Sequence, residues 1–421
     1  MELTLQQDLA LKAVQLWYDS PSAPKVFKLF GFAGTGKTTL ARHFASQAKG
    51  VVMFAAYTGK AASVLRQMGC PGASTLHSLL YSVSEHDRSR LHQVEDDLAQ
   101  QNALPPEEQD LFLIDLLTEE QASLRKRMNQ PRFTLNPEGN AADADLIIVD
   151  ECSMLNAEMA RDLESFKAKI LVMGDPGQLP PIRGWGHYTE GNPDVLLTEI
   201  HRQARDNPIL RFATMAREGA KIPMCDLGAA KKLSNKKIKP HELVQEYGHQ
   251  VLVGKNVNRR KINLAVREAL GFEGEFPKEK ERLVVLRNDK DFGVLNGVTC
   301  VAASDCITVP DDEAIIGSLM YEGQLLADLA MDPLPYTIYS APHHAVNDLE
   351  FQVTSPDRRW MIPTDWSYAL TVHKAQGSQW PKVLLVDDGF GNWGGDPALR
   401  GQWLYTAITR AQDELIILGA S

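Results

Sequence analysis

Cysteine is scarce in this sequence, and its placement argues against a disulfide-bonded protein and against a zinc-binding one. The five cysteines are scattered, with no C-x-x-C pair and no Cys/His cluster at the spacing of a zinc site. This pattern predicts reduced thiols, which are typical of a cytoplasmic protein, and it argues against a structural metal.

Long apolar runs are absent too. No uninterrupted apolar stretch approaches the roughly 18 to 20 residues that are needed to span a membrane. The first ten residues, MELTLQQDLA, carry an acid at position 2 and lack a basic start with an apolar core, so we expect no signal peptide. We therefore expect no membrane partner and a cytoplasmic location.

Positive charge is in deficit, with 44 Lys and Arg against 54 Asp and Glu in 421 residues. A net charge of −10 counts against a protein that coats nucleic acid through its overall field. Much of the deficit is local, because residues 81–130 hold eleven acids and five Lys or Arg. Basic clusters occur at 231–239 and 258–261, so a local basic groove stays open as an interpretation. The length predicts about two to four domains.

A phosphate-binding loop is present. The stretch GFAGTGKTT (31–39) fits G-x-x-x-x-G-K-[ST], follows the apolar run KVFKLF and precedes a helical pattern. Glycines let successive backbone N–H groups point at phosphate oxygens, the lysine reaches the β- and γ-phosphates, and the threonine hydroxyl binds Mg²⁺. The predicted nucleotide-binding residues are Gly31, Gly34, Gly36, Lys37, Thr38 and Thr39.

Two further apolar runs end in groups that suit a phosphate site. LIIV delivers Asp150 and Glu151, and we expect Asp150 to hold Mg²⁺ and Glu151 to act as a general base on water. ILVM runs into GDPGQLPPI, where Gln178 can sense the γ-phosphate. Because the carboxyl ends of parallel strands meet at one sheet edge, these groups predict an ATP site.

The second half of the chain repeats this alternation of apolar strands and helical segments, which predicts a second parallel sheet. Arg202 in EIHRQ and Arg410 in YTAITRA each follow an apolar element. An arginine that reaches the γ-phosphate from another domain stabilises transition-state charge, so we expect both to act as fingers across a cleft. For either residue taken alone, a surface arginine in an ion pair is the simpler interpretation.

These motifs, in this order, resemble the superfamily 1 DNA helicases of the RecD-like/Dda-like class. GFAGTGKTT, VDECSM and GDPGQLPPI resemble the P-loop, Walker B and glutamine-sensor motifs of that family, and EIHRQ and YTAITRA resemble its two arginine-finger motifs. LTLQQ resembles its adenine-reading segment, which assigns that role to Gln7. The resemblance covers about residues 7 to 410.

The resemblance implies an α/β fold with two RecA-like P-loop motor domains, each a parallel sheet flanked by helices, and two inserted accessory subdomains. We expect the first motor domain at 1–80 and 142–190, and the second at 191–300 and 366–421. The insert at 81–141 has an acidic helical part, and its end, QPRFTLNPEGN (130–140), resembles the strand-separating pin of the family, where Phe133 could stack on the last base pair. From the residues alone, an ordinary surface turn explains this stretch equally well. We expect the insert at 301–365 to form a small β-barrel, in which RRW (358–360) could hold a strand by stacking.

The resemblance also implies a path for single-stranded DNA across both motor domains. TGKAA and STLHSLL would contact the strand in the first domain and TVHKAQGSQW in the second. From the residues alone, helix capping by Ser74 or Thr75 and a partly buried histidine is the simpler interpretation of the first-domain segments. The predicted nucleic-acid-binding residues are Thr58, Lys60, Thr75, His77, Thr371, His373 and Lys374.

Three positions depart from the family pattern. Ala375 and Gln379 stand where the family frequently has Ser and Glu, which affects the expected nucleotide selectivity. Cys152 stands where Ala is frequent, and we interpret it as a packing difference.

The sequence thus predicts an ATP- and Mg²⁺-dependent helicase that moves along single-stranded DNA, with 5′-to-3′ polarity implied by the resemblance alone. Its expected partners are single-stranded DNA, junctions with duplex DNA and replication or recombination proteins, and we expect a monomer in a bacterial or phage-infected cell. Four alternatives stay open: a protein-stripping translocase, an RNA helicase, a nucleotide-gated binding switch and a small-molecule kinase.

Overall fold

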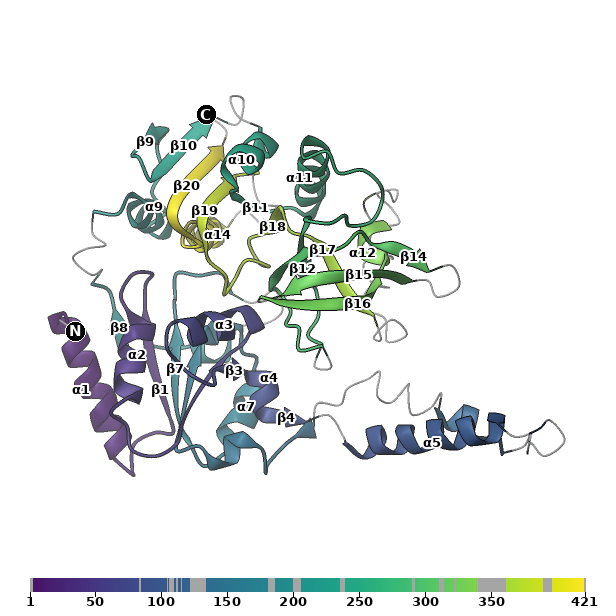
Figure 1. Ribbon diagram of the computed structural model, residues 1–421. Helices are drawn as coiled ribbons and strands as arrows, with labels where there is room; N and C mark the ends of the chain where they lie inside the picture. Colours follow the sequence, from purple (N-terminus) through teal and green to yellow (C-terminus); the bar gives the residue numbers. More distant parts are fainter. Residues whose placement is uncertain are drawn as a thin grey trace.

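A six-stranded parallel sheet forms the core of the first half of the chain (Figure 1). The computed structural model describes residues 3–82, 85–103, 105, 110, 113–114, 116–121, 134–180, 186–199, 206–234, 239–289, 292–309, 314–321, 323–337, 339, 361–388 and 396–419. The strand order is β3-β2-β6-β7-β1-β8. The strands are β1 (Val26–Gly31), β2 (Val52–Ala56), β3 (Ser74–Thr75), β6 (Leu146–Asp150), β7 (Lys169–Gly174) and β8 (Val195–Leu197).

Helices accompany this sheet because apolar strands such as Leu146–Val149 are buried on both faces and need cover on both. The helices are α1 (Leu5–Asp19), α2 (Lys37–Ala45), α3 (Gly59–Gln67), α4 (Leu76–Leu80) and α7 (Ala157–Ser165). Short 3-10 helices cover Asn140–Asp143, Cys152–Met154 and His187–Thr189.

A second six-stranded sheet forms the other half, in the order β18-β11-β19-β20-β10-β9. All its neighbours are parallel except the short edge strand β9, which pairs antiparallel with β10. The strands are β9 (Cys225–Asp226), β10 (Ala230–Ser234), β11 (Gln250–Val253), β18 (Ala369–Thr371), β19 (Trp380–Val386) and β20 (Ala411–Gly419). The helices are α9 (Pro208–Arg217), α10 (Pro240–Tyr247), α11 (Asn256–Ala269) and α14 (Pro397–Ile408).

A third sheet closes into a small barrel beside the second, because β13 pairs with both β12 and β15. Its elements are β12 (Arg282–Val285), β13 (Thr299–Ala302), β14 (Ile307–Val309), β15 (Ala314–Tyr321), β16 (Gln324–Asp332), α12 (Leu334–Thr337) and β17 (Ile362–Trp366).

Two predicted domain boundaries are wrong. The barrel begins at β12, before residue 301, because Leu283 pairs with Trp366 about eighty residues later, and an apolar run alone does not reveal its partner. Likewise β8, predicted in the second motor domain, pairs with β1 of the first sheet.

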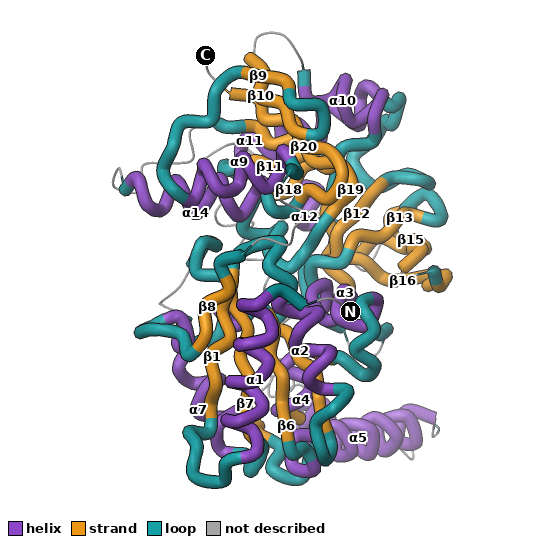
Figure 2. Tube along the Cα trace, turned by 90° about the vertical axis from the view of Figure 1, so that its left-hand side faces the viewer, coloured by secondary structure: helices purple, strands orange, loops and turns teal. Residues whose placement is uncertain are grey.

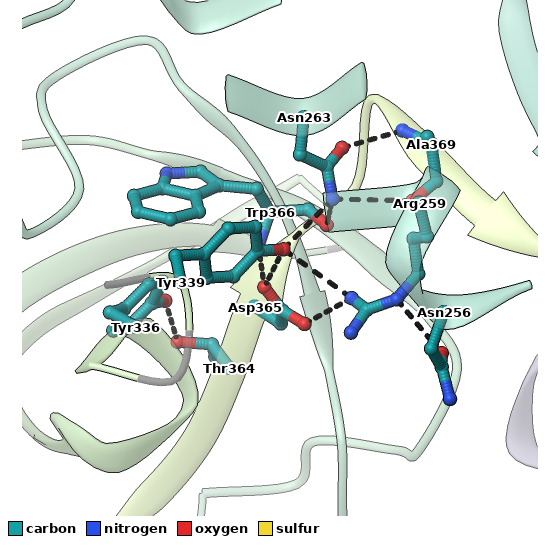
Figure 3. Close-up of polar contacts among 9 residues, drawn as sticks. All are labelled: Asn256, Arg259, Asn263, Tyr336, Tyr339, Thr364, Asp365, Trp366 and Ala369. Atoms are coloured by element: carbon teal, nitrogen blue, oxygen red, sulfur yellow. Dashed lines mark hydrogen bonds and ion pairs between the residues drawn. The ribbon is translucent and has the colours of Figure 1, made fainter. Parts of the chain in front are cut away.

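A buried polar network fixes the barrel on the second sheet (Figure 3). Arg259 of α11 forms a buried ion pair with Asp365 of β17, and the Tyr339 hydroxyl donates to the same carboxylate at 2.7 Å. Asn263 of α11 accepts the N–H of Ala369 at 2.7 Å and donates to the Trp366 carbonyl at 3.0 Å. The helix therefore holds strands of both sheets at once.

The insert at 81–141 leaves the first sheet through a two-stranded ribbon, β4 (Tyr81–Ser82) with β5 (Thr134–Leu135). The helix α5 (Glu85–Ala103) projects away from both sheets, as Figures 1 and 2 show. Its described side chains include a small apolar cluster of Val94 and Leu98 with Leu117. Within the part of the chain described, no helix is long and apolar enough to cross a membrane.

Candidate active site in the cleft between the two sheets

The phosphate loop joins β1 to α2 as the sequence predicts. Gly34 and Gly36 have φ values of 77° and 80°, a left-handed conformation that glycine adopts without strain. Gly36 caps α2, so the first N–H groups of that helix have no side-chain cap. The Lys37 ammonium donates to the carbonyl of Gly31 at 2.5 Å and of Phe32 at 3.1 Å. A phosphate could replace these two carbonyls as its partner.

Asp150 lies at the end of β6 beside the loop. Its Oδ2 accepts the Thr38 hydroxyl at 3.2 Å, so the two predicted Mg²⁺ ligands are neighbours. The next residue, Glu151, has φ 55° and ψ 44°, a left-handed conformation that costs energy for a residue with a side chain. Such local strain is common at functional sites and is consistent with a placed general base.

Burial perturbs both carboxylates. Desolvation raises the pKa of Asp150 above its ordinary value, and the charge of Lys37 opposes that shift. Desolvation also raises the pKa of Glu151, and the charge of Arg410 is the largest opposing influence. A carboxylate with a raised pKa is a stronger proton acceptor, which suits activation of water.

Gln178 lies in the turn after β7 and lines the same cavity. Its side chain is buried, and its Oε1 has no hydrogen-bond partner among the described residues. A buried amide oxygen without a partner is costly unless a ligand or water satisfies it. The position therefore fits a sensor of nucleotide or attacking water.

Arg410 enters the cavity from the second sheet, just after α14. It is 3% exposed, and its guanidinium donates to the carbonyls of Thr406 and Ser378 and to the Thr409 hydroxyl. The cavity has a volume of about 280 Å³. Its polar lining comprises Lys37, Thr38, Thr39, Asp150, Glu151, Asp175, Gln178, Gln379, Thr409 and Arg410.

Sequence reasoning missed the residues that join the two halves at this cavity. The Tyr405 hydroxyl contacts the phosphate loop and the turn after β7. Leu179 of that turn donates its N–H to the Thr406 hydroxyl at 2.8 Å and accepts from Gln376 at 3.0 Å. The available signal was their position in the two motifs that also carry Arg410 and Lys374.

Gln7 has a structural role at the start of α1. Its side chain forms a capping box with Thr4 at the start of α1, and its Nε2 donates to the Thr35 carbonyl of the phosphate loop at 2.9 Å. These bonds place Gln7 beside the loop, and its adenine-reading role stays a prediction.

The nucleic-acid residues of the first sheet follow β2 and β3. The Thr58 hydroxyl caps α3 and the Thr75 hydroxyl caps α4, accepting the N–H of Ala61 and Ser78. Lys60 is half-buried in the first turn of α3. His77 packs between the rings of Tyr57 and Tyr81, and burial lowers its pKa. Helix capping thus occupies the Thr58 and Thr75 hydroxyls. The two segments nevertheless lie at the same sheet edge, because they follow the neighbouring strands β2 and β3.

The matching residues of the second sheet follow β18. Thr371 is buried and accepts the N–H of Lys374 at 3.4 Å, and the Lys374 side chain is exposed. Burial lowers the pKa of His373. A Cβ added to Gly377 in this loop would lie 2.8 Å from Oγ1 of Thr58. The predicted DNA segments of the two halves therefore touch.

Other predicted features lie outside the described residues or have modest roles. Arg202, Phe133 and the RRW segment at 358–360 are outside the described residues. Cys152 is fully buried in the first core, Ala375 is buried in the core of the second half, and Gln379 lines the cavity and accepts from Gln412.

The donor set is that of a phosphate-bound cation rather than a protein-only metal centre. Among the described residues, no group of three or more His, Cys, Asp or Glu could hold a metal ion. Thr38 and Asp150 supply one hydroxyl and one carboxylate beside the phosphate loop, and phosphate and water would complete a Mg²⁺ shell.

Comparison with known proteins agrees with this geometry. The model of a family described as "AAA domain" matches residues 12–233, more than half of the chain, and "UvrD-like helicase C-terminal domain" matches 367–418. The "ATP-dependent RecD2 DNA helicase" of Deinococcus radiodurans is 26% identical over 425 residues, 96% of this chain. The chain spans 48% of the length of that relative.

Solved structures share the fold. The Pif1 helicase from Candida albicans superposes with a TM-score of 0.53 at 16% identity, covering 100% of this chain and 95% of that one. A Pif1 structure that addresses DNA unwinding at forked duplex DNA gives 0.53 at 17% identity, covering 99% and 92%. The predicted fold class of two RecA-like domains is confirmed.

Proposed function

The chain belongs to the AAA domain family, its matches bear out the resemblance to RecD-like superfamily 1 helicases, and from this premise we propose that it is an ATP-dependent DNA helicase. The proposed motor moves along single-stranded DNA in the 5′-to-3′ direction and separates duplex DNA ahead of it. One observation carries the proposal: a single cavity is lined by Lys37, Asp150 and Glu151 from one sheet and by Arg410 from the other.

This arrangement couples hydrolysis to the distance between the two sheets. Lys37 and the loop N–H groups bind the phosphates, and Glu151 accepts a proton from the attacking water, which Gln178 orients. Arg410 stabilises the charge that develops on the γ-phosphoryl group only when the cleft is closed. Mg²⁺, held by Thr38 and Asp150, would neutralise phosphate charge. Turnover therefore alternates the closed and open states of the cleft.

The same closure changes the spacing of the two proposed DNA segments. Thr58 and Lys60 belong to the first sheet, and Thr371 and Lys374 to the second, with Gly377 against Thr58 between them. If each segment binds backbone phosphates, opening and closing of the cleft moves one DNA-binding segment relative to the other along the strand. A duplex step is worth about 1.4 kcal/mol on average, so a rigid obstacle suffices to separate strands ahead of the motor.

The testing experiment is strand displacement with ATP and Mg²⁺ on two partial duplexes, one with a 5′ tail and one with a 3′ tail. ATP hydrolysis is followed in the same reactions, with and without single-stranded DNA. We expect DNA-stimulated hydrolysis and displacement of the 5′-tailed duplex alone.

Each other result favours a different activity. Displacement of the 3′-tailed duplex alone would reverse the polarity. Stimulated hydrolysis without displacement would support a protein-stripping translocase and direct attention to Phe133 in the insert. Slow hydrolysis that DNA does not change would contradict a motor and support a nucleotide-gated switch. An RNA strand of the same sequence tests the choice of nucleic acid through its 2′-hydroxyl groups.

A further inference from the structure

Tyr405 lies between the phosphate loop and the turn after β7, although it belongs to the second half of the chain. It is on α14 and 2% exposed, and its hydroxyl oxygen accepts the N–H of Ala33 at 2.7 Å. The same hydroxyl donates to Oδ2 of Asp175 at 2.6 Å. One hydroxyl group thus joins two catalytic segments of the first sheet from across the cleft.

Hydrogen bonds of Asp175 connect this contact to Gln178. Its Oδ1 accepts the N–H of Gly177 at 2.9 Å, and its backbone carbonyl accepts the N–H of Gln178 at 3.1 Å. These bonds fold the tight turn that directs the Gln178 side chain toward the cavity. The conformation of the turn, and hence the place of Gln178, depends on the partner that holds the Asp175 carboxylate.

The approach of Tyr405 is close and well packed. A Cβ added to Gly177 would lie 3.0 Å from Cε1 of the tyrosine ring, so glycine leaves the room that the ring needs. Beside it, the Arg217 guanidinium lies 3.7 Å from the centroid of the Phe32 ring in the phosphate loop. Burial raises the pKa of Tyr405, so the hydroxyl keeps its proton and remains a donor to Asp175.

We propose that Tyr405 is a positioning residue that sets Gln178 and the phosphate loop in their catalytic arrangement when the cleft closes. Arg410 follows Tyr405 by five residues, so one movement of α14 brings both the arginine and the hydroxyl to the site. Closure then brings the positive charge of Arg410 to the transition state and, at the same time, aligns Gln178 with the attacking water. The inference rests on the proposed ATP hydrolysis and extends it by one residue.

The test is Tyr405→Phe, which removes only the hydroxyl. DNA-stimulated kcat, the KM for ATP, and the affinities for ADP and for ADP with aluminium fluoride are measured. In the proposal, the hydroxyl holds Ala33 and Asp175 together only when the cleft is closed. Its removal should therefore weaken the closed, reactive state, and we expect kcat to fall about tenfold or more. Affinity for the aluminium fluoride complex should fall in parallel, while ADP affinity stays within about twofold.

Tyr368→Phe is the matched control. It is also a buried tyrosine in the second half of the chain, but it packs in the core on the side of the barrel and does not line the cavity. We expect this variant to leave all four quantities unchanged. Asp175→Asn provides a second route, and the double variant Tyr405→Phe/Asp175→Asn should lose little more kcat than the worse single variant, because both act through one contact.

Two results would overturn the inference alone: an unchanged kcat in Tyr405→Phe, or equal loss of affinity for ADP and the aluminium fluoride complex with a lowered Tm. The second pattern would mean a structural role. A wild-type chain that does not hydrolyse ATP would overturn the proposed function, and this inference with it.

Discussion

Gly377 and Thr58 meet at the boundary between the two halves, where a Cβ on the glycine would stand 2.8 Å from the threonine hydroxyl. Gly377 has φ 73°, so an L side chain there is strained even without a neighbour. The contact joins the segment after β18 to the first turn of α3. Both are segments for which we propose contacts to single-stranded DNA.

Gly377→Ala should therefore push apart the two proposed DNA-binding segments, the one after β18 and the first turn of α3. We expect DNA-stimulated hydrolysis to fall about five- to tenfold, because the added methyl group combines backbone strain with a clash. Gly271→Ala is the control for strain alone, since Gly271 has φ 80° and a Cβ there meets nothing within 4 Å. Equal loss of stimulation in both variants would mean that the contact with Thr58 has no part in coupling.

Lys37→Ala should abolish hydrolysis and retain single-stranded DNA binding. The ammonium lies among loop carbonyls that a phosphate would replace, and the proposed DNA residues are on other elements. Turnover is measured with saturating DNA, and binding by fluorescence anisotropy of a labelled oligonucleotide. Turnover near the wild-type rate would contradict the assignment of the nucleotide site.

Arg410→Ala should slow hydrolysis by about 10³- to 10⁵-fold with little loss of ATP affinity, because an arginine finger acts mainly on transition-state charge. Arg400→Ala is the matched control, since Arg400 is also contributed by α14 but pairs with Asp387. We expect that control to stay within about twofold of the wild type. If Arg410→Ala instead weakens ATP binding and leaves kcat intact, Arg410 binds the ground state.

The sequence predicted the parts of this site that depend on local motifs. The glycine spacing and the polar residues at strand ends were enough to predict that Thr38 lies beside Asp150 and that the chain forms two parallel sheets. It did not predict the partners of Tyr405, which depend on how two distant sheets meet, nor the pairing of β12 with β17. Gln7 shows a further limit, because its motif does not reveal that a capping box already uses its amide.

The proposed DNA contacts should divide into charged and neutral ones. Burial lowers the pKa of His77 and of His373 below the ordinary value of 6.5, so both rings are neutral at pH 7.5 and gain charge only at lower pH. Lys374→Ala should reduce the slope of log K against log salt by about 0.7, the value for one contact to a single strand. His77→Gln and His373→Gln should leave that slope unchanged at pH 7.5. A reduced slope in either histidine variant at this pH would show that the bound ring is protonated.

Asp365→Ala should destabilise the attachment of the barrel strongly, because it leaves the buried Arg259 guanidinium without its carboxylate and removes the acceptor of the Tyr339 hydroxyl. Breaking one side of a buried pair typically costs about 3 to 5 kcal/mol. Asp305→Ala removes an exposed pair with Lys278 and an acceptor of the Glu279 N–H in the same region, and we expect a much smaller loss of stability. Urea unfolding of both variants, followed by tryptophan fluorescence that includes the buried Trp366, measures the difference. Similar small losses would mean that Arg259 finds another partner or reaches water, and that the network in Figure 3 does not hold the barrel in place.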